Sequence, residues 1–217
     1  MKSLLKPALI IAGMLAATFA VAQGDPKANE LLNKVSKKYQ AYTTIKAVFS
    51  VTTENQTDKK KTTEEGTVML KGANFRLDFG GQEIYCDGKT LWTYVKDANE
   101  VTIEAYKPKD GAVTPNEIFN IQKKGYNAMY DGSVTRNNKT FEILKLSPKV
   151  PKNAQLSYVK AEIDKTTNQM DRMLMYYKNG MVVTYTVKTF TPNGAMADNS
   201  FVFNATSKPG VTVVDLR

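Results

Sequence analysis

The stretch Asp87-Gly88-Lys89-Thr90-Leu91-Trp92-Thr93-Tyr94 joins a turn dipeptide to an apolar segment that carries the only tryptophan of the chain. Asp-Gly between two apolar segments is a strong hairpin signal, and a type I′ turn needs positive φ at both central residues. We therefore predict a type I′ hairpin at Asp87-Gly88, whose second strand runs from Thr90 to Val95.

Apolar and polar residues alternate on both sides of this hairpin, which is typical of half-buried strands. The pattern indicates extended segments, some only three residues long, near residues 45–52, 68–70, 75–79, 84–86 and 101–106, and then at 126–130, 140–146, 156–163, 169–177, 181–190, 201–203 and 211–214. We expect a mainly β fold of about ten or eleven antiparallel strands, in which neighbours along the chain pair with each other.

Two helices are expected beside these strands. Asp25-Pro26 resembles a helix start, with aspartate as the N-cap and proline at the first helical position, and the apolar spacing that follows predicts a helix over residues 26–41. Thr114-Pro115-Asn116-Glu117 is a capping box that opens a second, short helix carrying Ile118, Phe119 and Ile121.

The first 22 residues have the pattern of a secretory signal: two lysines, an apolar run and the ending Ala20-Val21-Ala22. No second long apolar segment follows it. We expect residues 1–22 to be removed, and residues 23–217 to form a single exported domain in the periplasm.

Composition excludes several kinds of site. The chain has no histidine, so histidine-based catalytic triads and the commonest zinc sites cannot form. Cys86 is alone, which rules out an intramolecular disulfide, and its alternation with Ile84 predicts a buried thiol. No carboxylate spacing marks an acid/base pair, so we expect no enzyme, metal or cofactor.

The net charge of +9 becomes 28 − 21 = +7 once the two lysines of the signal are removed. Such a charge favours transient approach to anionic membranes, although scattered lysines on strand exteriors would explain it as well. No basic block pairs with an aromatic ladder, and so we expect no nucleic-acid partner.

A long sheet with one apolar face must cover that face or close on itself. With only two small helices as cover, a strongly bent sheet would enclose an apolar space, which either packs solid or holds a ligand. The inward-facing candidates are Phe49, Val51, Leu70, Phe75, Leu77, Trp92, Tyr94, Met173 and Met175.

The segment from Asp87 to Tyr94 resembles the DGKTLWxY motif of the LolA family of periplasmic lipoprotein carriers. The ending from Pro209 to Arg217 is similar to that family's GVxVxDxR close, and the order of elements matches over the whole mature chain.

This resemblance implies an incomplete, half-open antiparallel barrel with a helical lid over an apolar cavity. The cavity would hold the acyl chains of lipoproteins, received from an inner-membrane ABC transporter and passed to an outer-membrane acceptor. By position in the family, Leu31, Val35, Ile118, Phe119 and Ile121 would form the underside of the lid. We expect the carrier to be a monomer.

One departure concerns the lid. Where the family has Arg-Pro between its second and third strands, this chain has Gly72-Ala73, and the family arginine is part of the lid latch. Arg76 is the candidate substitute.

Other functions on the same fold stay open. The chain could be an envelope-stress sensor that binds a membrane-anchored regulator, or a general lipid- or glycolipid-binding protein. A secreted hydrolase is a third alternative, without a recognisable catalytic group.

Overall fold

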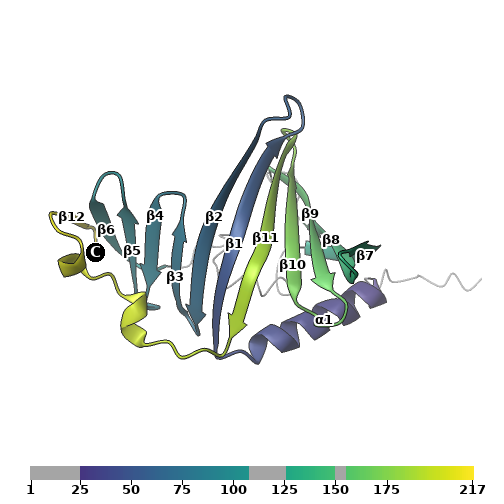
Figure 1. The fold of residues 1–217 in the computed structure, drawn as a ribbon, viewed down its shortest axis with the longest axis horizontal. Helices are drawn as coiled ribbons and strands as arrows, with labels where there is room; N and C mark the ends of the chain where they lie inside the picture. The colour runs from purple at the N-terminus through teal and green to yellow at the C-terminus, as the bar shows by residue number, and fades with distance from the viewer. Residues whose placement is uncertain (1–24, 108–125, 150–154) are drawn as a thin grey trace, which may run out of the picture.

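The computed structural model describes residues 25–107, 126–149 and 155–217. They form one helix, two short 3-10 helices and a single curved sheet of twelve strands (Figure 1). The elements are α1 (Pro26–Gln40), β1 (Thr44–Asn55), β2 (Lys61–Lys71), β3 (Asn74–Phe79), β4 (Gln82–Cys86), β5 (Thr90–Val95), β6 (Glu100–Ala105), β7 (Tyr126–Arg136), β8 (Lys139–Pro148), β9 (Leu156–Asp164), β10 (Met170–Tyr177), β11 (Met181–Pro192), η1 (Asp198–Phe201), η2 (Ala205–Ser207) and β12 (Thr212–Asp215).

The strands lie in the order β12-β6-β5-β4-β3-β2-β1-β11-β10-β9-β8-β7. Two antiparallel meanders meet where β1 pairs with β11, and β7 and β12 are the edges of an open sheet. This confirms the predicted mainly β, half-open architecture. Pairing is antiparallel throughout except at one edge, where β12 is parallel to β6. That pairing corrects the expectation of antiparallel neighbours, because the chain crosses from the centre of the sheet to its edge before forming β12.

The predicted N-terminal helix is confirmed as α1. The Asp25 carboxylate accepts the backbone N–H groups of Lys27 and Ala28, satisfying donors that have no partner within the helix. Its other oxygen accepts the backbone N–H of Tyr130 in β7 at 2.6 Å. These N–H groups, Tyr130 first, lower the pKa of Asp25. One side chain thus starts the helix and fixes it to the sheet edge.

The Asp87-Gly88 hairpin is present, but it is not a type I′ turn. Gly88 has a φ of +84°, whereas Asp87 is not among the residues with positive φ. The Asp87 carboxylate instead accepts the N–H groups of Lys89 and Thr90 at 2.9 and 2.7 Å. This side-chain turn needs only one residue in the left-handed region. The prediction of turn type was wrong for that reason.

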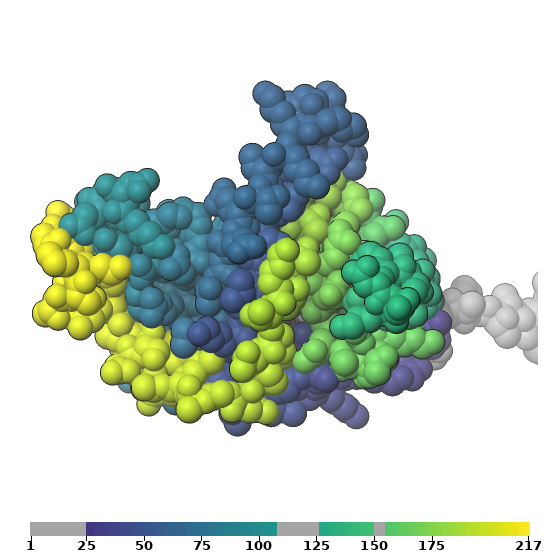
Figure 2. Space-filling view, in the orientation of Figure 1, coloured from purple at the N-terminus to yellow at the C-terminus, as the bar shows by residue number. Residues whose placement is uncertain are grey.

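The C-terminal segment after β11 differs from the prediction as well. Residues 201–203 were expected to be a strand, but Phe201 ends the 3-10 helix η1 and no strand includes Phe203. Both rings are buried, at 0% and 8% exposure. Two apolar residues separated by one position, such as Phe201 and Phe203, can thus bury their side chains from an irregular segment and need not form one face of a strand. The segment borders the teal strands in Figures 1 and 2.

Candidate functional site

The inner face of the sheet is the face on which α1 packs. Cross-strand pairs such as Ala47 with Val68 and Leu70 with Phe75 continue one apolar surface across the centre of the sheet. The helix buries its apolar side against this surface, and the hydroxyl of Tyr39 accepts the backbone N–H of Met170 at 3.0 Å. Burial raises the pKa of Tyr39 to about 12. Because Tyr39 contacts the first residue of β10, the helix covers the end of the sheet where β10 begins (Figure 1).

Most of the predicted inward-facing residues lie on this surface. A first group belongs to the buried cluster between α1 and the sheet. It consists of the strand residues Leu70, Phe75 and Met173, together with Leu31 and Val35 of α1, which were predicted as the underside of the lid. A second group is only partly buried and packs against that cluster, and it consists of Phe49, Leu77 and Met175. Val51 of β1 is buried and pairs with Tyr185 of β11. The inner face is thus closed under the helix and still partly accessible beyond it.

Sequence reasoning missed several members of the accessible part, and Ile84 and Tyr185 are two of them. Both are partly buried and pack against the same cluster. Both could have been found by strand parity, since Ile84 pairs with Leu77 and Tyr185 pairs with Met173. Together with Phe49, Leu77 and Met175 they form what we call the apolar band: five half-buried side chains on five strands.

Gly66 shapes this band. A Cβ atom at Gly66 would lie 2.6 Å from Cζ of Phe49 and 2.9 Å from the carbonyl oxygen of Asp78. The absence of a side chain lets the Phe49 ring lie over the glycine and contact Phe79, with ring centroids 5.7 Å apart. The glycine therefore sets the position of a large aromatic side chain of the band.

Trp92 and Tyr94 lie elsewhere. Tyr94 belongs to a second buried cluster with Tyr85, Val101 and Phe203, against which Trp92 packs. Trp92 pairs with Tyr85, whereas its neighbour Leu91 pairs with Cys86 of the inner cluster, so the second cluster is on the outer face. The lone tryptophan of the recognised motif thus packs on the side opposite the apolar band.

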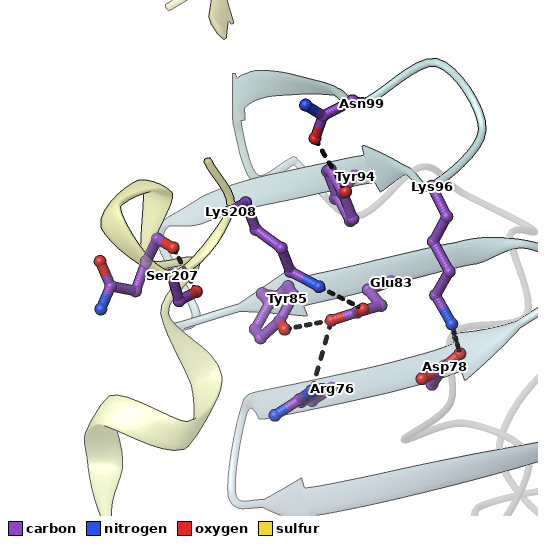
Figure 3. A network of polar contacts seen from close by, with 10 residues as sticks. Arg76, Asp78, Glu83, Tyr85, Tyr94, Lys96, Asn99, Ser207 and Lys208 are labelled. Carbon is purple, nitrogen blue, oxygen red and sulfur yellow. Dashed lines mark hydrogen bonds and ion pairs between the residues drawn. The ribbon is translucent and has the colours of Figure 1, made fainter. Parts of the chain in front are cut away.

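A polar network borders the outer cluster (Figure 3). The buried Glu83 carboxylate accepts one hydrogen bond from Lys208 Nζ at 2.8 Å and another from the Tyr85 hydroxyl. It also accepts a longer hydrogen bond from the Arg76 guanidinium, at 3.3 Å. Burial alone would raise the pKa of Glu83, but the bonds from Lys208 and Tyr85 outweigh it and lower the pKa. The network ties the C-terminal segment, through Lys208, to β3 and β4.

Arg76 is therefore not placed to latch a lid over the inner face. Its guanidinium contacts Glu83 and lies 4.6 Å from the centre of the Tyr85 ring, both on the outer face. That placement corrects its assignment as substitute for the family arginine. Gly72, with a φ of +57°, is exposed in the turn between β2 and β3.

Three predicted lid residues, Ile118, Phe119 and Ile121, lie outside the described residues, as does the predicted signal segment. Cys86 is fully buried, and burial raises the pKa of its thiol. In the described ranges, no group of three or more His, Cys, Asp or Glu side chains could hold a metal ion. No helix within them is long and apolar enough to cross a membrane.

Comparison with known proteins agrees with this geometry. The profile of the family described as "Outer membrane lipoprotein carrier protein LolA" matches residues 40–204. The chain belongs to the LolA family. The match begins at the end of α1 and extends to the outer-face segment beyond Phe203, so both faces described above fall within the LolA region. Members of the family are binding and carrier proteins rather than enzymes.

Individual relatives of this LolA-family chain are distant. An uncharacterized protein of Methanocaldococcus jannaschii is 26% identical over 166 residues, which is 74% of this chain and 49% of the relative. The chain thus spans about half the length of that curated relative. A solved uncharacterized conserved protein from Thermus thermophilus has a TM-score of 0.59 at 14% identity, covering 87% of this chain and 99% of its own.

Two further solved structures are less similar. A LolA superfamily protein from Nitrosomonas europaea has a TM-score of 0.43 at 12% identity, covering 81% of this chain and 97% of its own. A chain of the Pseudomonas aeruginosa MucA/MucB complex has a TM-score of 0.40 at 12% identity, covering 82% and 62%.

Proposed function

We propose that this protein is a periplasmic carrier that binds the acyl chains of lipoproteins on the apolar band and transports them from the inner to the outer membrane. The observation that supports the proposal is the band itself. Its five side chains continue the core yet stay partly exposed, on a sheet that does not close. Apolar side chains exposed together on a concave surface are typical of a ligand site.

The energetics suit a reversible carrier. Each methylene group removed from water contributes about 0.8 kcal/mol. Sequestering roughly ten methylene groups would give about 8 kcal/mol before the costs of binding, which corresponds to a complex near the micromolar range. Such a complex holds its cargo in water and still releases it to a second apolar site.

The partners follow from the proposed role. The carrier would receive acylated lipoproteins from an inner-membrane lipoprotein-releasing ABC transporter and deliver them to an outer-membrane acceptor, working as a monomer that approaches each membrane transiently. Residues 1–22 would direct export. The predicted lid residues Ile118, Phe119 and Ile121 would complete the apolar site above the band.

Two adjacent residues of β10 provide a matched test. Met175 lies on the inner face within the apolar band, and Leu174 points to the outer face, where it pairs with Lys160 and Thr184. Met175→Glu places a charge in the proposed site, while Leu174→Glu places the same charge on the same strand outside it. We expect native mass spectrometry of periplasmic protein to show bound acylated protein in the wild type and in Leu174→Glu.

Met175→Glu should lose this cargo while keeping its fold, as judged by circular dichroism. Cargo retained in Met175→Glu, or lost equally in both variants, would contradict binding on the inner face.

A further inference from the structure

Three tyrosines reach the accessible part of the inner face from three different strands. Tyr126 begins β7, Tyr177 ends β10 and Tyr185 lies in β11. Tyr126 and Tyr185 pack against the inner cluster, and Tyr177 pairs with Leu156, which packs against the same cluster. Met170, the first residue of β10, is hydrogen-bonded to Tyr39 of α1, whereas Tyr177 is the last residue of the same strand. Tyr177 therefore lies at the end of β10 that is far from the helix.

Tyr177 interacts with both of the other phenols. Burial raises the pKa of both Tyr126 and Tyr185, and in each case the neighbouring Tyr177 raises it further. The curvature of the sheet therefore brings side chains from an edge strand and two interior strands into one cluster. A phenol hydroxyl is able to donate a hydrogen bond.

The hydroxyls of this cluster differ from those of the packed tyrosines. Tyr39, Tyr85 and Tyr94 each have a hydrogen-bond partner, namely Met170 N–H, the Glu83 carboxylate and the Asn99 side chain. Within the described ranges, no hydrogen bond is made by the hydroxyls of the inner-face cluster, and all three of its residues are half-buried. None of the three hydroxyls is among the buried unpaired atoms of the described residues, so each is open to water at the surface. A ligand that offers an acceptor can replace that water, and three such donors beside one apolar surface provide polar groups that would orient an apolar ligand.

The chemistry of the ligand follows from this combination. An apolar band takes up hydrocarbon, and phenol donors beside it suit uncharged carbonyl oxygens. An acyl-linked lipid has both groups, with its carbonyls at the head of its chains. We propose that Tyr126, Tyr177 and Tyr185 bind the carbonyl oxygens of the acyl linkages of a lipid whose chains lie on the apolar band. This assignment rests on the proposed function and identifies the part of the cargo that the carrier recognises.

The test compares two ligands of equal chain length. Dioctanoylglycerol carries ester carbonyls, and dioctylglycerol carries ether linkages without them. Each displaces N-phenylnaphthylamine, an apolar dye that reports on the band alone, from full-length mature protein. The inner variant replaces Tyr126, Tyr177 and Tyr185 with phenylalanine. The control variant carries Tyr158→Phe and Tyr176→Phe, which alter a stacked outer-face pair with ring centroids 4.4 Å apart.

We expect the wild type and the control variant to bind the ester more tightly than the ether. A neutral hydrogen bond contributes about a fivefold factor, so the inner variant should bind the ester at least about tenfold more weakly. Its affinities for the ether and for the dye should stay unchanged, because the apolar band is intact.

Three results would overturn the proposal: equal binding of ester and ether by the wild type, unchanged ester binding in the inner variant, or tighter binding of octanoate than of dioctanoylglycerol. If neither the dye nor any lipid binds the wild type, the proposed carrier function itself fails, and that outcome is distinct from these three.

Discussion

Removing the aromatic anchor of the C-terminal segment should separate stability from binding. In Phe203→Ala the lost ring is 8% exposed and contacts the rings of Tyr85 and Tyr94, with centroid distances of 5.7 and 5.4 Å. Truncating a buried phenylalanine to alanine typically costs 3–5 kcal/mol, and each aromatic pair adds about 1 kcal/mol beyond its buried area. Because an irregular surface segment can partly collapse onto the gap, we expect a loss of about 3 kcal/mol.

The assay is urea unfolding followed by the fluorescence of Trp92, the only tryptophan of the chain, which packs against this same cluster. Dye binding, measured below the unfolding transition, should remain at the wild-type level, since the apolar band is on the other face. A loss of stability below about 1 kcal/mol would refute the role of Phe203 as an anchor. A folded Phe203→Ala protein that no longer binds the dye would refute the separation of the two faces.

Three more predictions concern single positions. The pKa of Asp25 lies below its ordinary value of 3.8 because the carboxylate is stabilised in the folded protein. Its contribution to the free energy of unfolding is therefore complete above pH 3.8 and is lost as the pH falls through the lowered pKa. Asp25→Asn should make the thermal unfolding temperature depend less on pH in this acid range. Gly66→Ala should destabilise by about 1–3 kcal/mol through overpacking and, because Phe49 must move, weaken dye binding; a neutral result in urea unfolding would count against the close contact. Lys208→Met leaves the buried Glu83 with fewer partners and should cost about 3 kcal/mol, whereas a second change, Glu83→Gln, should recover part of that loss in a double-mutant cycle.

Local signals predicted the elements of this fold well. The Asp25-Pro26 start and the alternation of residues such as Phe75 and Leu77 correctly indicated α1 and the strands, because helix capping and strand burial depend on neighbouring residues. The parallel pairing of β12 could not be read in this way, since it depends on where the C-terminal segment crosses the sheet.

The residues of the site were predicted only in part, because their placement also depends on contacts between distant parts of the chain. Alternation shows which residues share a face, but it does not show which face is inner when both are covered. In β5, Leu91 faces the inner cluster while Trp92 and Tyr94 face a cluster covered by Phe203, a residue more than a hundred positions away in the chain. The cover of the outer face is a tertiary feature, and so Trp92 and Tyr94 were grouped with the inner residues.

The most direct test of the account is photo-crosslinking from the two faces of neighbouring strands in living cells. Benzoylphenylalanine replaces Leu77, which lies in the apolar band, or Met69, which pairs with Arg76 on the outer face. After irradiation, the adducts are identified by mass spectrometry. The account predicts acylated lipoprotein, joined through its acyl chains, at position 77 and not at position 69. Adducts to acyl chains at position 69 alone, or at neither position, would contradict it.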